Sequence, residues 1–403
     1  MIKIRPFKAF RPTRDKANLV ASRSYLTYSN ETIKEKLDHN PYTFLHIINP
    51  DYKFNKKTTG VTKFELVREK FNEFVNAGIF KKDSVASYYI YRKITKTSTF
   101  TGIIGAAAVK DYLNNKIKKH EQTLSKRENI FCDYLDTTGF NAEPVLLSYK
   151  ASHETKAILR RHTDSRPEYE FTTTNKALHE LWLVNEPTDI KDITNAFKKI
   201  ENLYIADGHH RCASSALLSN HKKSEASKYF MSYLIDENQL NILNFNRLVK
   251  NLNNLTPKQF LNKIRSNYTI INKAEETYTP TLQYEISMYL DNHWYSLIAK
   301  KEKYTSISSS LDPSILSRNI LNPILNIIDE RTDKNISFLN GSIPLCTIKE
   351  KIDNKEYAVA FILKSIDINA IKKVADNNEI LPPKSTYVEP KLRSGLTIYH
   401  IEE

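Results

Sequence analysis

The chain has 403 residues, enough for two domains or for one large domain with a lobe. Hydrophobic residues make up 40% of it and charged residues 26%, a globular composition that excludes a disordered chain. The net charge of +14 is compatible with nucleic acid, an anionic substrate or a lysine-rich surface. Because the basic residues form no long block, most of them are expected to be solvated surface charge.

Membrane insertion and secretion are not indicated. No uncharged apolar run reaches the roughly 18 residues that a membrane span requires. Residues Met1–Phe7 carry charge at once and lack the apolar core of a signal peptide. Cys132, Cys212 and Cys346 are odd in number and far apart, so neither a disulfide framework nor a zinc module is indicated. These features predict a cytoplasmic protein.

Strand-like and helix-like segments alternate along the chain, which predicts a mixed α/β (α+β) fold. In the first half, the expected strands are Tyr42–Ile48, Ser87–Ile94, Thr99–Ile104 and Glu180–Val184, with the middle two forming a hairpin. The expected helices are Lys63–Asn76, an alanine-rich stretch after Gly105, and Asp189–Ile200 with Asp189 as the N-cap. Gly102 and Gly105 are expected in a tight passage from strand to helix.

In the second half, strands alternate with one long helix. The expected strands are Phe230–Ile235, Ile242–Leu248, Leu282–Leu290, Trp294–Ala299 and Tyr357–Ile362. Leu311–Ile328 has helical spacing, and Pro323 must kink or split it. We predict an N-terminal part, 1–240, and a C-terminal α+β part, 241–403, that completes the functional site; a single compact unit is the alternative.

The most informative segment runs from Leu203 to Leu218. A β-prone run, Leu203–Ala206, meets the turn pair Asp207-Gly208, and a helix is expected from Cys212. Such a junction directs unpaired backbone N–H groups and the positive end of the helix dipole to one spot. The residues between them, His209, His210 and Arg211, add donors, so the junction indicates an anion site, with phosphate the favoured anion.

Glycine usage strengthens this interpretation. The chain has 8 glycines in 403 residues, about 2%, against roughly 7% in average proteins. Each glycine is therefore expected where backbone geometry or a close approach demands it, and Gly208 is placed where a phosphate oxygen can approach the main chain. A simple turn before a helix is the alternative, and Asp-Gly alone would favour it.

Two further clusters carry possible chemistry. Within five positions, Lys119, His120, Glu121 and Thr123 offer a base, hydrogen-bond donors and a hydroxyl. A polar helix end is the alternative, and spacing alone favours it. The proline-stiffened segment Pro382–Gly395 is a second anion-contacting candidate or a stiff surface tail. Its donors are Lys384, Ser385, Thr386, Lys391 and Arg393.

Several common motifs are absent. The sequence has no Gly-x-x-x-x-Gly-Lys phosphate loop and no Gly-x-Gly-x-x-Gly dinucleotide turn. His209 and His210 are adjacent, so on a helix they diverge by about 100° and would not chelate one metal as an i, i+4 pair would.

These residues resemble a bacterial and archaeal family of the ParB/sulfiredoxin superfamily, long known only as a domain of unknown function. The resemblance extends over nearly the whole chain. It rests on Ile205–Arg211 and on Ile4–Pro12, Tyr42–Ile47, Gly102–Thr123, Phe245–Val249 and Glu389–Gly395. Sulfiredoxins carry a catalytic cysteine where this chain has His209, which argues against their reaction.

The resemblance implies a ParB/sulfiredoxin-like core around the junction, with additional N- and C-terminal α+β elements. It further implies transfer of a phosphoryl group to free L-serine, giving O-phosphoserine for cysteine synthesis. Long relatives include enzymes that use inorganic pyrophosphate, whereas shorter ones use a nucleotide. We therefore expect a pyrophosphate-dependent serine kinase, with an ATP- or ADP-dependent kinase as the alternative.

Residue roles follow from the resemblance as expectations. Gly208, His209, His210 and Arg211 would hold the donor phosphates, with Mg²⁺ sharing their charge through Asp207. Glu121 is the expected base for the serine hydroxyl, next to the phosphate-binding candidates Lys119, His120 and Thr123. Lys391 and Arg393 would close over the donor or bind the serine carboxylate.

Two competing functions remain. A ParB-like protein that binds nucleotides or DNA would fit the charge, although the sequence shows no clear helix-turn-helix or basic stripe, which argues against nucleic acid. A phosphatase or another small-molecule phosphotransferase would use the same phosphate-binding residues.

Overall fold

The computed structural model describes residues 1–24, 27–52 and 58–402. By their contacts, these residues divide into two compact units. The first comprises 1–119, 123–240 and 390–403, and the second 120–122 and 241–389. We expected parts 1–240 and 241–403; here residues 120–122 group with the second unit and residues 390–403 with the first.

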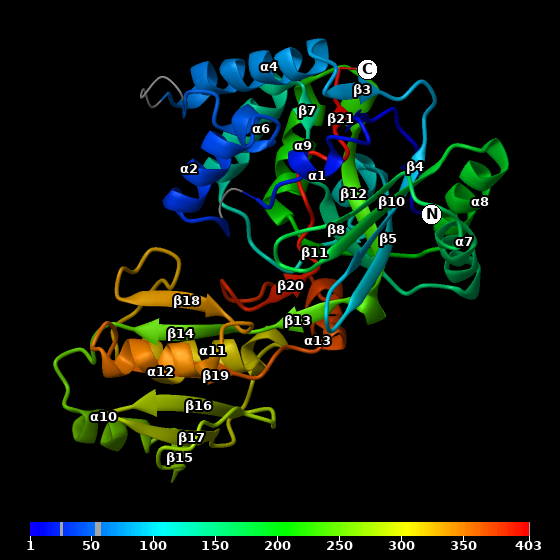
Figure 1. Ribbon diagram of the computed structural model, residues 1–403. Coiled ribbons are helices and arrows are strands. Elements are labelled where there is room, and N and C mark those ends of the chain that lie inside the picture. The colour runs from blue at the N-terminus through cyan, green and yellow to red at the C-terminus, as the bar shows by residue number, and fades with distance from the viewer. Residues whose placement is uncertain (25–26, 53–57, 403) are drawn as a thin grey trace. The chain divides into compact units, whose positions relative to one another are not determined.

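The first unit is built on a sheet of nine strands with mixed directions (Figure 1). Its order is β6 (Ile117–Lys118), β11 (Leu203–Asp207), β8 (Val145–Tyr149), β12 (Tyr229–Asp236), β5 (Thr99–Ala108), β4 (Tyr88–Ile94), β10 (Leu178–Val184) and β9 (Tyr169–Thr172), with β1 (Ile4–Arg5) on β5. β11 runs parallel to β6, and β12 runs parallel to β8; the other pairs are antiparallel.

Helices and two short strand pairs complete the first unit. The helices are α1 (Ala17–Val20), α2 (Asn30–His39), α3 (Leu45–Ile48), α4 (Gly60–Asn76), α5 (Val109–Leu113), α6 (Ser125–Thr138), α7 (His153–Thr163), α8 (Pro187–Lys198) and α9 (His209–His221). The strand pairs are β2 (Phe10–Pro12) with β3 (Phe80–Lys82), and β7 (Phe140–Asn141) with β21 (Tyr399–His400). α6 packs against both α4 and α9. This packing holds one side of α9, and β8 and β12 contact it as well.

The second unit contains a six-stranded antiparallel sheet (Figure 1). Its order is β15 (Tyr268–Asn272), β17 (His293–Ala299), β16 (Glu285–Leu290), β19 (Val359–Leu363), β14 (Phe245–Val249) and β18 (Ile336–Asn340). β13 (Asn241–Leu243) pairs separately with β20 (Tyr387–Glu389). The helices are α10 (Pro257–Ile264), α11 (Asp312–Leu316), α12 (Leu345–Asp353) and α13 (Ile368–Asp376). Together the two units confirm the mixed α/β fold class.

Several predicted elements are confirmed. α4 covers the expected helix Lys63–Asn76 and buries Val67, Phe71 and Phe74. β4 and β5 form the expected hairpin. The strands expected at 180–184, 230–235 and 294–299 are present as β10, β12 and β17.

The expected strand Tyr42–Ile48 is wrong. The end of this segment is the short helix α3, with Leu45, His46 and Ile47 buried. Phe44 and Ile47 pack in a hydrophobic cluster with Phe71 and Phe80. The prediction failed because periodicity over so short an apolar run does not distinguish a strand from a helix.

The expected passage from strand to helix at Gly102 and Gly105 is also wrong, because β5 continues to Ala108. A Cβ at Gly102 would lie 2.4 Å from the Leu234 carbonyl oxygen, and one at Gly105 would lie 2.9 Å from the Tyr88 ring. Glycine is therefore required here by close packing of β5 against its neighbours, not by a turn.

Three boundaries differ from the prediction. In place of the one helix expected over 311–328, the structure has α11 followed by a π-helical turn at Ser317–Leu321, which ends before Pro323. Strand 242–248 is split at Asn244 into β13 and β14, which belong to different sheets. Asp189 is not an N-cap: α8 begins at Pro187, and Asp189 lies in its first turn, 2.5 Å from Arg161. Among the described residues, no helix has the length and apolar character to cross a membrane.

Candidate functional site

The junction between β11 and α9 has the predicted strand–turn–helix form. Gly208 joins the two elements with φ +102° and ψ 30°, a left-handed conformation that favours glycine. The helix begins at His209, three residues earlier than expected, and its first turn closes through a 3.0 Å bond from Cys212 N–H to the Gly208 carbonyl. The N–H groups of the first helical residues thus have no partner within the helix.

A β-bulge sets the direction of Asp207. The pairing of β11 with β8 shifts register between Ile205 and Asp207. Such a bulge re-aims the side chain that follows it and is frequent beside functional sites. Asp207 therefore lies at the end of the strand, directly before the helix N-terminus, with about a third of its side chain exposed.

Two cations share the Asp207 carboxylate. Arg211 Nη2 lies 2.6 Å from Oδ2, and Lys391 Nζ lies 2.6 Å from Oδ1. Burial raises the pKa of Asp207, but the charges of Lys391 and Arg211 outweigh it, so the pKa lies below its ordinary value. Asp207 is therefore ionised at neutral pH and balances one of the two positive charges.

The Arg211 side chain folds back over the turn. A Cβ at Gly208 would lie 3.0 to 3.2 Å from the guanidinium atoms, so a side chain here would push the guanidinium back by a few tenths of an ångström. Nη1 also donates to the Pro144 carbonyl at 2.6 Å, and Glu143 lies 3.8 Å away. The guanidinium is thus held in place at the helix N-terminus.

The two histidines lie in different surroundings. His209 is only 4% exposed, and burial lowers its pKa to about 3, although Asp207 opposes the shift. Its imidazole is therefore neutral at physiological pH and can act as a hydrogen-bond partner or metal ligand, but not as a cation. The His210 ring lies 6.5 Å from the ring of Phe131 on α6.

Buried neutral histidines make stability depend on pH. Burial lowers the pKa of His179 to about 3, as it does for His209, with Arg393 and Lys93 adding to the shift. Between about pH 3 and 6.5 the unfolded chain therefore binds more protons at these two positions than the native protein does. Below pH 6.5, we expect each to lower the free energy of unfolding by about 1.4 kcal/mol per pH unit. Denaturant titrations of His179→Gln should show a shallower loss on acidification, whereas exposed His153→Gln is the matched control; equal slopes would contradict the expectation.

Four predicted residues lie in the first unit with the junction. Lys119 directly follows β6, the parallel neighbour of β11, and its charge helps to lower the pKa of His209. Lys391 pairs with Asp207, as above, whereas Arg393 Nη2 donates to Asn175 Oδ1 at 3.1 Å. Thr123 donates to Glu128 at the start of α6.

The other predicted residues belong to the second unit. The backbone carbonyl oxygen of His120 accepts a 2.9 Å hydrogen bond from Leu381 N–H, and Glu121 lies in the same short segment, 120–122. The proposed roles of His120 and Glu121 stay predictions. Ser385 Oγ donates to the Pro382 carbonyl at 2.7 Å. Lys384 and Thr386 lie in the same part of the chain, so Pro382–Gly395 divides between the units after residue 389.

Sequence reasoning missed three polar residues near these groups. Glu143 accepts from Ser394 at 2.8 Å and approaches Arg211. Lys93 Nζ lies 3.4 Å from the Lys391 carbonyl oxygen, and Asn175 holds Arg393. None of the three stands in a motif; each is brought in by tertiary contact, and no local signal identifies it.

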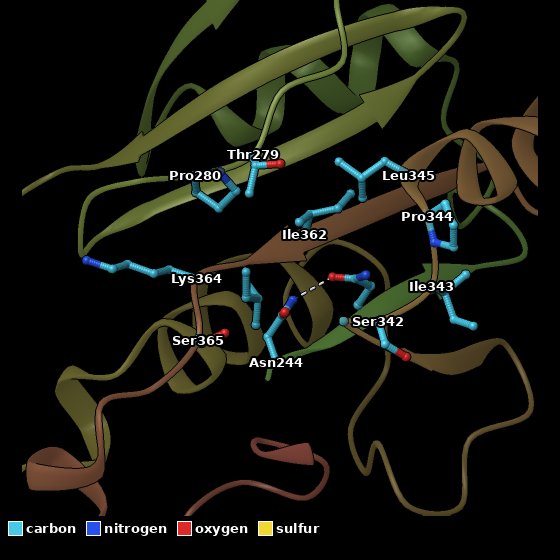
Figure 2. A pocket seen from close by; sticks show the side chains of 13 residues that line it. Asn244, Thr279, Pro280, Ser342, Ile343, Pro344, Leu345, Ile362, Lys364 and Ser365 are labelled. Atoms are coloured by element: carbon cyan, nitrogen blue, oxygen red, sulfur yellow. Dashed lines mark hydrogen bonds between the residues drawn. The ribbon is translucent and has the colours of Figure 1, made fainter. Parts of the chain in front are cut away.

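The second unit contains a cavity of about 470 Å³ (Figure 2). Its polar lining includes Asn244, which donates to Asn246 at 2.5 Å. Lys364 is the one charged residue among the described residues that line it, and Figure 2 shows its side chain extending away from the others. The cavity is therefore poorer in positive charge than the β11–α9 junction, which we favour as the phosphate site.

Comparison with known proteins shows the family to which this chain belongs. A family model described as "Protein of unknown function (DUF1015)" matches residues 4–314. No functionally curated protein is similar to this chain in sequence. A free serine kinase in complex with AMP is 13% identical over 73% of this chain and 91% of its own, with a TM-score of 0.39. A conserved hypothetical protein from Pyrococcus furiosus is 14% identical over 73% of this chain and 94% of its own, with a TM-score of 0.36.

Proposed function

We propose that this chain, which belongs to the DUF1015 family of proteins of unknown function, is a small-molecule phosphotransferase. The helix N-terminus and the two cations at the β11–α9 junction support this proposal. The proposed reaction transfers a phosphoryl group to the hydroxyl of free L-serine and yields O-phosphoserine. Inorganic pyrophosphate is the proposed donor. The observation that carries the proposal is the pairing of Asp207 with both Arg211 and Lys391 at the N-terminus of α9.

This arrangement suits the chemistry of phosphoryl transfer. The reaction needs mainly in-line positioning and neutralisation of the charge on the phosphoryl oxygens. Backbone N–H groups at the start of α9, the Arg211 guanidinium and the Lys391 ammonium are donors for such oxygens. His209 would contribute as a neutral hydrogen-bond partner, since its pKa of about 3 keeps it uncharged.

A Mg²⁺ ion fits the residues present. Mg²⁺ in phosphate sites is commonly held by one or two carboxylates together with substrate phosphates. Asp207 is ionised and partly exposed beside the helix N-terminus, so it would hold the ion. When bound, Mg²⁺ would supply further charge neutralisation to the phosphate oxygens.

Pyrophosphate is favoured because it is compact and highly charged. Its charge matches a site made of backbone N–H groups and two cations, and it needs no adenine pocket. An ATP- or ADP-dependent serine kinase is the alternative donor class. In either case O-phosphoserine would be the product, available for cysteine synthesis.

Phosphorus NMR tests the reaction directly. Purified protein is incubated with Mg²⁺, L-serine and one donor at a time: pyrophosphate, ATP or ADP. We expect O-phosphoserine and orthophosphate to appear with pyrophosphate and the signal to be lost in His209→Ala. Phosphoserine from a nucleotide alone would retain the kinase and overturn the donor. No phosphoserine from any donor would overturn the function and leave a ParB-like nucleotide or DNA protein to be tested by titration.

The role of Glu121 has its own test. A general base in such a reaction contributes about 10²- to 10⁴-fold in rate. We expect Glu121→Gln to lower kcat by at least about 100-fold while leaving the KM for pyrophosphate nearly unchanged. Initial rates of phosphoserine formation measure both constants. Glu350→Gln on α12 removes a carboxylate at no predicted site position and is the matched control; a kcat for Glu121→Gln within threefold of the wild type would assign the base to another residue.

A further inference from the structure

The cavity of the second unit lies at the N-terminal end of α12 (Figure 2). Pro344 and Leu345, where that helix begins, form one part of its lining, and Asn246 of β14 and Ile362 of β19 form another. Its lining residues all belong to the second unit. Small-molecule sites commonly have volumes of about 300 to 1,000 Å³, so a cavity of about 470 Å³ has room for a small organic ligand.

Asn246 is a buried polar residue next to an apolar cluster. Alternate residues of a strand share a face, so Asn246 and Leu248 lie on the same face of β14. Leu248 packs in a cluster with Ile348 and Ile352 of α12. Asn246 is only 1% exposed, and among the described residues nothing accepts a hydrogen bond from its Nδ2. Burial of an unpaired amide N–H group is costly, so this group indicates a ligand that carries an acceptor.

A second amide holds Asn246 in place. Asn244 Nδ2 donates to Asn246 Oδ1 at 2.5 Å, and Figure 2 draws this bond. A Cβ at Gly341 would lie 2.4 Å from Asn244 Oδ1, so glycine at this position leaves room for the Asn244 amide. Because the bond engages the Asn246 oxygen, the side chain offers a ligand its Nδ2 donors.

The N-terminus of α12 supplies further donors. α12 has nine residues, its N-cap Pro344 makes no side-chain hydrogen bond, and its first turn contains no acidic residue. In the described part of the chain, no group accepts a hydrogen bond from the N–H of Leu345 or Cys346. Unpaired N–H groups and the helix dipole favour an anion at this end. A helix end alone identifies no ligand, but here the buried donor of Asn246 lines the same cavity.

Charge and shape restrict the class of anion. Lys364, directly after β19, is the only charged residue among the described residues that line the cavity. Its charge also acts on the buried Asp312 carboxylate, which is not among them. A single cation suits a ligand with one negative charge better than a phosphate monoester, whose charge is about −1.5 to −2 at pH 7. Ile343, Leu345 and Ile362 provide an apolar wall for the rest of the ligand.

We propose that this cavity binds a small organic monocarboxylate with an aliphatic body. The carboxylate accepts hydrogen bonds from Asn246 Nδ2 and from the N–H groups at the start of α12, and the aliphatic body contacts Ile343 and Ile362. The site shares no residue with the β11–α9 junction. It therefore goes beyond the proposed phosphotransferase reaction and does not depend on it.

Calorimetric titration of the full chain compares N-acetyl-L-leucine with N-acetyl-L-leucinamide, which has the same aliphatic body but no carboxylate. The wild type is expected to bind the acid about tenfold more tightly, because charge-assisted hydrogen bonds are the stronger ones. Asn246→Asp keeps the size of the side chain and the acceptor for Asn244 but places a negative charge in the cavity. It should abolish the preference by weakening the acid at least about tenfold, while the amide binds nearly as before. Asn262→Asp, at an exposed position of α10, makes the same change in net charge and is the matched control.

Cys346→Asp tests the helix N-terminus from an exposed position. The added carboxylate lies in the first turn of α12, where it competes with the ligand for the same N–H groups. The affinity for N-acetyl-L-leucine should fall about three- to fivefold. Cys346→Ser adds no charge and should keep the wild-type affinity.

The outcomes separate this proposal from the proposed function. A preference that is lost in Asn246→Asp and kept in Asn262→Asp supports the site, whether or not any donor yields phosphoserine. Equal affinity for acid and amide, or no measurable binding of the acid, overturns it. An acid affinity that falls in Arg211→Gln but not in Asn246→Asp would assign the acid to the β11–α9 junction instead. Orthophosphate that binds the wild type more tightly than the acid does, and is weakened by Asn246→Asp, would overturn the carboxylate class. If Asn246→Asp does not fold, Cys346→Asp decides.

Discussion

Replacing Arg211 with glutamine is expected to lower kcat/KM for phosphoserine formation about 10³-fold. The guanidinium is fixed over Gly208 by Asp207 and the Pro144 carbonyl, so it is already placed beside the helix N-terminus. Preorganised cationic or hydrogen-bonding groups at a transferring phosphoryl group are worth about 10²- to 10⁵-fold in rate. Glutamine can still donate a hydrogen bond, but its side chain is shorter and lacks the positive charge and the paired N–H donors of the guanidinium.

Initial rates at varied donor and serine concentrations measure the Arg211→Gln effect. We expect the KM for pyrophosphate to rise much more than the KM for L-serine, because Arg211 belongs to the donor side of the site. Lost hydrogen bonding to the Pro144 carbonyl should cost about 1 kcal/mol of stability, which a denaturant titration separates from the activity loss. Arg161→Gln removes an exposed guanidinium that pairs with Asp189 and serves as the control. An unchanged donor KM in Arg211→Gln would be incompatible with a phosphate role.

Replacing Asp207 with asparagine is expected to move two measurements in opposite directions. The proposed Mg²⁺ ligand is lost, so turnover should fall about 10²- to 10³-fold and the affinity for Mn²⁺, a paramagnetic substitute, should fall at least tenfold. Arg211 and Lys391 lose their counter-charge at the same time. Metal-free binding of pyrophosphate should therefore become tighter, because no carboxylate competes for the two cations.

Electron paramagnetic resonance of free Mn²⁺ and calorimetry with pyrophosphate provide the two readouts for Asp207→Asn. Asp136→Asn, which removes an exposed carboxylate paired with Lys222, is the matched control and should leave both unchanged. Weaker metal-free pyrophosphate binding in Asp207→Asn would show that the carboxylate orders the site and does not merely balance its charge. Unchanged Mn²⁺ affinity would remove Asp207 as the metal ligand.

Local sequence signals were sufficient wherever a structure depends on neighbouring residues. The apolar run Leu203–Ala206, the turn pair Asp207-Gly208 and the following helical spacing identify the β11–α9 junction, because each signal acts over a few residues. The helical spacing of Val67, Phe71 and Phe74 identifies α4 for the same reason. The scarcity of glycine correctly indicated that neighbouring groups approach the backbone closely at glycine positions. At Gly102 and Gly105, however, the cause is packing against neighbouring strands and not a turn.

Tertiary structure decided the electrostatics of the site and which distant segments of the chain meet there. Lys391 meets Asp207 across 184 positions of sequence, because residues 390–403 return to the first unit. Burial, which no local pattern reports, makes His209 neutral although its type suggests a phosphate-binding cation. The sequence by itself thus determined which residues form the strand, the turn and the helix. Which charges meet there, and which are neutral, depends on long-range packing and desolvation, which act between residues that are distant in sequence.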